Sequence, residues 1–129
     1  MPREQPGPTV RLLIFSGRPD PEWSLDEGAV RQLGERLART IGGERAPSPQ
    51  PFVGLGYRGF LVQNPSNVPG LPATFSVFRR VLAEPHGPRA NHWRDAGDVE
   101  GWLLAQARER GFGKALEAFG AGAEPPGQR

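Results

Sequence analysis

Two histidines and an aspartate lie close together in the sequence and could form a metal site. His86, His92 and Asp95 fall within ten residues. Two imidazoles and a carboxylate can hold a catalytic metal ion and leave a coordination position open. Their spacing matches no helical metal motif, however, and Pro85 and Pro88 indicate a loop. One hypothesis is therefore a small enzyme that uses these three residues. We nevertheless predict that the protein holds no metal ion and no cofactor.

Arginine and aromatic side chains in expected loops or at element ends support a second hypothesis. Such side chains are typical binding anchors, although they can also cap a small core. No catalytic constellation is recognisable beside them. We therefore expect a non-catalytic binding or accessory protein whose concave face holds a peptide, a protein or a small acidic ligand. The residues expected on this face are Arg18, Trp23, Tyr57, Arg58, His92 and Trp93.

The segment Gly54–Gly59 formally matches the G-x-G-x-x-G pattern of dinucleotide-binding loops. That fingerprint requires a helix after the glycines, because the helix N-terminus holds the pyrophosphate. Asn64-Pro65 follows too soon for such a helix. We expect instead that Gly56 and Gly59 permit a bulge or the close approach of another backbone.

Arg58-Gly59-Phe60 also looks like the start of the strand motif of RNA-recognition domains. Phe60, with Phe15 on the first strand, would then stack on bases of single-stranded RNA. The aromatic residue expected two positions after Phe60 is absent. RNA binding is therefore a third hypothesis, and nucleic acid is not our expected partner.

The segment 16–23 joins the first expected strand to the first expected helix. Arg18 beside free helix N–H groups could hold a carboxylate or a phosphate. The alternative is a rigid connection in which prolines fix the path and Trp23 packs onto the helix. The motifs S-G-R-P-D-P-E-W and L-G-Y-R-G-F resemble those of small uncharacterised bacterial proteins, and this resemblance implies no activity.

The amino-acid composition narrows the classes of function that the chain can have. There is no cysteine, which excludes disulfides and thiolate chemistry. Lys114 is the only lysine, and the arginine excess is typical of a GC-rich bacterium. The formal net charge of +2 is small, so a polyanion partner is not indicated. The N-terminus lacks the apolar segment of a signal peptide, and no membrane span is apparent, so we expect a cytoplasmic protein.

Two helices are predicted. Ser24-Leu25-Asp26-Glu27 matches a capping box and would begin a helix that runs to about Thr40. Apolar residues at spacings of three and four support this helix. Asp98 suits the N-cap of a second helix, and Gly111 would end it. Residues 112–119 could be a strand or a further helical turn.

Three strands are predicted, at 9–15, 57–63 and 73–83, the last two joined as a loose antiparallel hairpin. In the last strand, Phe75, Val77, Val81 and Ala83 should share one face. Residues 84–97 should be irregular. The expected fold is α+β, in the order β-α-β-β-α: a small, mostly antiparallel sheet of three to four strands with two helices packed on one face.

One domain is expected over residues 9–119, between a disordered arm at 1–8 and a disordered tail at 120–129. A sheet of three or four strands leaves two exposed edges. A homodimer formed through such an edge is therefore plausible.

Overall fold

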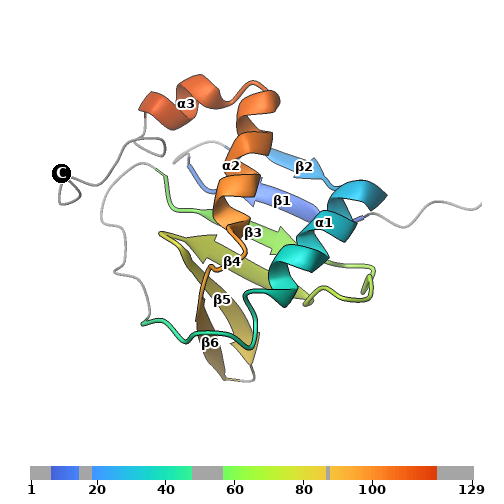
Figure 1. Ribbon diagram of the computed structural model, residues 1–129. Coiled ribbons are helices and arrows are strands. Elements are labelled where there is room, and N and C mark those ends of the chain that lie inside the picture. The colour runs from blue at the N-terminus through green and yellow to red at the C-terminus, as the bar shows by residue number, and fades with distance from the viewer. Residues whose placement is uncertain (1–6, 15–18, 48–56, 87, 119–129) are drawn as a thin grey trace, which may run out of the picture.

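The computed structural model describes residues 7–14, 19–47, 57–86 and 88–118. They form a six-stranded, wholly antiparallel sheet and three helices (Figure 1). The strands are β1 (Thr9–Leu12), β2 (Glu22–Ser24), β3 (Phe60–Gln63), β4 (Thr74–Phe78), β5 (Val81–His86) and β6 (Arg89–Arg94). The helices are α1 (Glu27–Ala38), α2 (Val99–Glu109) and α3 (Gly113–Ala118). From edge to edge the strand order is β2-β1-β3-β4-β5-β6.

The α+β class is confirmed, but the expectation of three to four strands and two helices is wrong. The first missed strand is β2. Its residue Trp23 pairs with Val10 of β1, and both side chains are buried. Ser24 belongs to this strand, so the predicted capping box does not form. Asp26 is the N-cap of α1 instead, and its Oδ1 accepts the Ala29 N–H at 2.8 Å.

The segment expected as one strand over 73–83 is a tight hairpin. Arg79 and Arg80 connect β4 to β5 and have φ values of 52° and 68°. Left-handed φ at both central residues is the requirement of a type I′ hairpin turn, which usually selects Asn-Gly. The reversal pairs Val77 with Leu82, so Val81 and Ala83 lie on the other face, contrary to expectation. The segment expected to be irregular, 84–97, supplies all of β6 and the end of β5.

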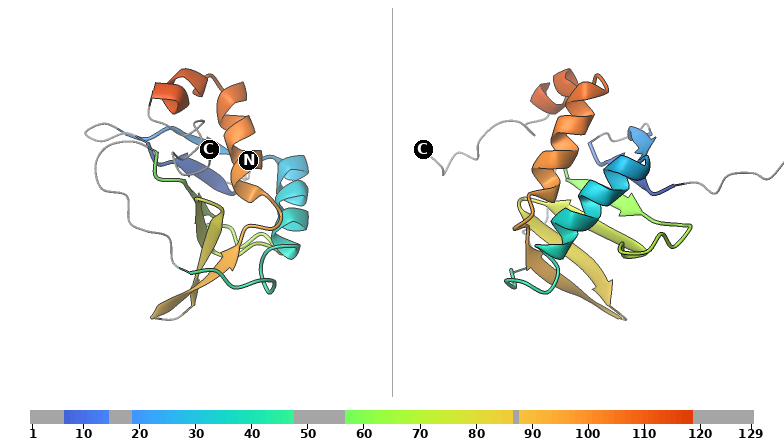
Figure 2. Two further views of the ribbon diagram at one scale, coloured as in Figure 1. Left: turned by 60° about the vertical axis from the view of Figure 1, so that its left-hand side comes forward. Right: turned by 45° about the vertical axis from the view of Figure 1, so that its right-hand side comes forward.

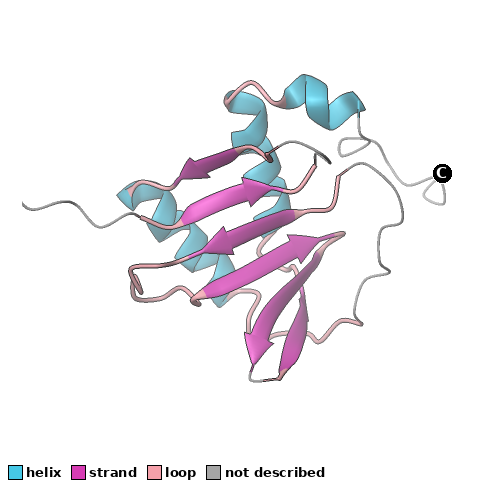
Figure 3. Ribbon diagram, turned by 180° about the vertical axis from the view of Figure 1, so that it is seen from behind, coloured by secondary structure: helices cyan, strands magenta, loops and turns pink. Residues whose placement is uncertain are grey.

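The helices lie on one face of the sheet, as expected (Figures 1 and 3). Buried apolar side chains of the sheet and the helices form one core cluster. Alternation along the strands buries one set of side chains against the helices: Val10, Leu12, Phe60, Val62, Phe75, Val77 and Leu82. Seen from behind, no helix of the described residues crosses the opposite face (Figure 3). The β5–β6 hairpin is steeply twisted relative to β1–β4 (Figure 2).

The edge of the sheet at β6 is covered by the chain that follows α1. Ala46 donates its N–H to the His92 carbonyl at 3.0 Å, and Arg94 donates to the Glu44 carbonyl at 2.8 Å. Arg45 forms a bridge with Trp93 between these two bonds. The other edge, β2, has only three residues. In the described ranges, no helix has the length and apolar character needed to cross a membrane.

Candidate functional site

Glu100 lies at the centre of a buried polar network in the first turn of α2. Its side chain is nearly inaccessible to solvent, yet its carboxylate accepts three hydrogen bonds. Two come from the backbone N–H groups of Arg79 and Arg80, at 3.2 and 2.8 Å. The third comes from the Tyr57 hydroxyl. A buried carboxylate is tolerated when several donors satisfy it, and these three donors come from two other parts of the chain.

Glu100 therefore holds the β4–β5 turn in its left-handed conformation. An L-residue other than glycine in this conformation costs roughly 1–2 kcal/mol, and here two arginines adopt it in succession. The Glu100 carboxylate binds both backbone amides from the side of α2. The side chains of Arg79 and Arg80 are exposed. Backbone strain of this kind persists only where the surrounding structure holds it, and it is frequent at functional sites.

Asp95 supports the same network from the β6–α2 connection. Its carboxylate oxygens accept the Val99 and Glu100 N–H groups at 2.7 and 2.8 Å. Its own N–H donates to the Arg80 carbonyl at 2.9 Å. Burial raises the pKa of the Asp95 carboxyl, while the two backbone hydrogen bonds act in the opposite direction. Asp95 thereby fixes the start of α2, and with it Glu100, against the turn.

Tyr57 is half-buried at the side of this turn. Its ring makes edge contacts with Phe60 and Phe78, with centroids 5.9 and 5.7 Å apart. Burial raises the pKa of its phenol far above the usual value, and the neighbouring Glu100 carboxylate raises it further. The Tyr57 hydroxyl therefore keeps its proton at neutral pH and donates a hydrogen bond to Glu100, so it does not act as a base.

Four exposed arginines are neighbours of Phe78, at the end of β4, through the chain or through strand pairing. Arg79 and Arg80 follow it directly, and the Arg79 guanidinium lies 5.1 Å from the centre of its ring. Val81, which pairs with Phe78, also pairs with Arg94. Gly59 packs tightly against Phe78, and Arg58 directly precedes Gly59 in the chain. We call this group, Arg58, Arg79, Arg80 and Arg94 around Phe78, the arginine corner.

The arginine corner presents guanidinium groups at the surface, while the carboxylates of Glu100 and Asp95 are buried beneath it. Glu100 accepts from backbone groups and Tyr57 beneath the surface, and Asp95 accepts from the start of α2. Arg94 pairs with Glu44 at 3.2 Å on the surface. Within the described ranges, neither Arg79 nor Arg80 forms an ion pair. Guanidinium groups in this arrangement suit a carboxylate or a phosphate.

Of the six residues expected on one concave face, the five that the structure describes are not brought together. Trp23 and Trp93 lie on β2 and β6, at opposite edges of the sheet, and both are buried toward the helix side. Trp23 stacks on Phe112 and donates to Gln106 at 2.9 Å, while Trp93 packs beneath the Arg45 guanidinium at 4.4 Å. Both indoles are core elements. Arg18 lies outside the described residues.

Only Tyr57 and Arg58 of that set belong to the arginine corner and its support. His92 lies on the face of the sheet away from the helices, opposite Ala83. Asp95 faces the start of α2, so His92 and Asp95 do not converge. His86 ends β5, and its side chain lies outside the described structure. Among described side chains, no group of three histidines or carboxylates could hold a metal ion.

The structure bears on two of the interpretations of the segment 54–60, RNA stacking by Phe60 and a close backbone approach at Gly59. Phe60 is fully buried on the helix side of β3, so it cannot stack on a base. Gly59 has a φ of 95°, and an added Cβ would overlap the Val77 carbonyl. A close backbone approach at Gly59 is thus confirmed. Gly54 and Gly56, like Phe15, lie outside the described residues.

Comparison of this chain with protein-family models, with curated protein sequences and with solved structures finds no match. The candidate site therefore rests on geometry and chemistry alone.

Proposed function

We propose that this protein is a non-catalytic binding protein that holds an acidic ligand at the arginine corner. The observation that supports this most strongly is the β4–β5 turn. Two arginines occupy left-handed positions that favour asparagine and glycine, and a buried carboxylate holds them there. A turn selected for stability alone would not need two guanidinium groups.

The corner combines charge with an apolar surface. Phe78 is partly exposed between the guanidinium groups, and Val81 continues this surface on β5. Carboxylates of a peptide would pair with Arg79 and Arg80, while the ligand's apolar atoms would cover the ring of Phe78. An acidic peptide segment therefore fits the corner in both respects.

The fixed turn also lowers the cost of binding. Because Glu100 already restrains the backbone of Arg79 and Arg80, a ligand needs to order only the outer parts of their side chains. The aromatic ring of Phe78 further restricts the Arg79 side chain. Preorganised donors of this kind distinguish a binding surface from scattered surface charge.

The test is calorimetric titration of the full chain with a tetraglutamate peptide, at low salt and at physiological salt. Binding should weaken as salt screens the charges. Replacing Arg79→Gln together with Arg80→Gln should reduce the affinity by about tenfold or more, because two charged hydrogen-bonding groups are lost. The matched control replaces Arg31→Gln and Arg39→Gln, two exposed arginines of the α1 region, and alters net charge equally.

Equal loss of affinity in both double variants would show that net charge alone attracts the peptide, and the proposal would then fail. Tighter binding of a single-stranded oligonucleotide than of the peptide would also overturn it, in favour of nucleic acid as the partner.

A further inference from the structure

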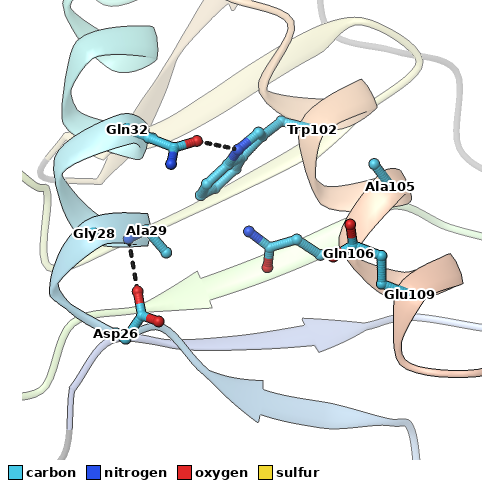
Figure 4. Close-up of a pocket in the computed structure, with 8 residues that line it drawn as sticks. All are labelled: Asp26, Gly28, Ala29, Gln32, Trp102, Ala105, Gln106 and Glu109. Carbon is cyan, nitrogen blue, oxygen red and sulfur yellow. Dashed lines mark hydrogen bonds between the residues drawn. The ribbon is translucent and has the colours of Figure 1, made fainter.

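A groove lies between α1 and α2, on the helix side of the molecule and apart from the arginine corner (Figure 4). Its volume is about 470 Å³, within the range of small-molecule sites. A second hollow of about 220 Å³ shares Asp26, Gln106 and Glu109 with it and adds Arg110. The two hollows therefore adjoin each other, and Arg110 lines only the smaller one.

Two glutamines present amide N–H donors in this groove. The Trp102 indole donates to Oε1 of Gln32 at 3.1 Å, and the Trp23 indole donates to Oε1 of Gln106 at 2.9 Å. An indole nitrogen can only donate, so each amide oxygen is fixed on its indole. The NH₂ groups are left to donate to a ligand, and Figure 4 shows that of Gln106 directed between the helices.

Two carboxylates supply acceptors across the same groove. Asp26 uses Oδ1 to cap α1, which leaves Oδ2 available. Glu109 projects from the last turn of α2 and is exposed. In the described parts of the chain, neither carboxylate forms an ion pair. A cationic group beside either carboxylate would form a charge-assisted hydrogen bond with it.

The groove also has positive charge at its end. Arg110 lines the smaller hollow, and its guanidinium lies 5.4 Å from the centre of the Trp23 ring. The stacked position restrains this side chain. Arg110 and the amide of Gln106 together can bind a carboxylate, and Glu109, which lines the same hollow, suits an ammonium group.

We propose that this groove binds a small zwitterion, a molecule that carries one ammonium group and one carboxylate, such as an amino acid. The ammonium group pairs with Glu109, and Asp26 lies on the opposite side of the groove. The carboxylate contacts Arg110 and the amide of Gln106, and the aliphatic part of the ligand packs on Trp102. The site is separate from the arginine corner, so either proposal can fail alone.

Three probes of equal chain length separate the contributions of the two charges: 6-aminohexanoate, hexylamine and hexanoate. Each is titrated into the full chain at physiological salt, while the indole N–H resonance of Trp102 is followed by NMR, assigned with Trp102→Phe. We expect 6-aminohexanoate to bind most tightly, hexylamine about tenfold more weakly, and hexanoate weakest.

Variants identify the contacts. Glu109→Gln should weaken 6-aminohexanoate binding about tenfold, and Arg110→Gln should reduce it to the level of hexylamine. The matched controls are Glu35→Gln and Arg31→Gln, exposed residues of α1 outside the groove, which should change nothing. The proposal is overturned if the Trp102 resonance does not respond to 6-aminohexanoate, if hexanoate binds equally well, or if Glu109→Gln binds as the unmodified chain does.

Discussion

Replacing the two arginines of the β4–β5 turn should make the protein more stable and less able to bind. The double variant Arg79→Asn, Arg80→Gly installs the sequence that a type I′ turn favours. Both positions keep their backbone hydrogen bonds to Glu100, because these involve main-chain N–H groups. The perturbation therefore removes strain and two guanidinium groups but leaves the network intact.

The magnitude follows from three contributions. The left-handed conformation costs an arginine about 1–2 kcal/mol at each of the two positions. Glycine and asparagine tolerate this conformation better, so the double replacement should recover roughly 2–3 kcal/mol in total. The glycine adds freedom to the unfolded chain, at a cost of about 0.4–1 kcal/mol. The contact of Arg79 with the Phe78 ring is lost, at about 0.5–1 kcal/mol. The net expectation is a gain of about 1 kcal/mol in the free energy of unfolding.

Urea denaturation measures this gain, and thermal unfolding should show an increase of about 4 °C in Tm. Tetraglutamate binding to the same variant should fall about tenfold or more. Arg31→Gln serves as the control, since it removes an exposed helical arginine without changing a strained backbone. A double variant that is less stable than the unmodified chain would refute the reasoning, because the arginines would then stabilise their own turn.

Further variants and conditions test the buried network and the sheet. Glu100→Gln replaces an acceptor with an NH₂ group, so one backbone N–H loses its partner; urea denaturation should show a loss of about 1–3 kcal/mol, and a loss near zero would contradict the network. Gly59→Ala should lose several kcal/mol of unfolding free energy or fail to fold, because its Cβ would overlap the Val77 carbonyl. Its control, Gly34→Ala in an open part of α1, should instead gain about 0.5–1 kcal/mol of unfolding free energy. Burial and Glu100 raise the pKa of Tyr57 in the folded chain, so the unfolded chain loses this proton first and the free energy of unfolding should fall as pH rises above about 10. Tyrosinate absorbance of this single tyrosine should then appear only with unfolding, and Tyr57→Phe should lack that part of the fall.

The parts of the fold that local sequence signals determine were predictable. Apolar spacing identified α1, and Asp98 and Gly111 correctly marked the two ends of α2. The N-cap of α1 was misplaced by two residues because Ser24 and Asp26 both suit that position. Tertiary pairing decided between them, since the strand that contains Trp23 and Ser24 is needed to cover the edge of β1.

The candidate site could not be predicted because its parts meet only in three dimensions. Arg79-Arg80 carries no turn signal, so the reversal between β4 and β5 depends on a carboxylate about twenty residues further along the chain. One local signal was present. The buried positions change from odd numbers, Phe75 and Val77, to an even number, Leu82, and such a change of phase indicates a reversal of two residues.

The strand order has a consequence for the way the chain folds. From β3 to β6 each strand pairs with the next one in sequence, and β1 pairs with β2 through a short connection. Among the pairings of the six strands, only that of β1 with β3 joins distant segments, since Thr9 is opposite Gln63. The largest loop closure among the strand pairings is therefore that of β1 with β3, which must wait during synthesis until residue 63 has left the ribosome. Shortening the chain between α1 and β3 should thus accelerate folding more than shortening any other connection.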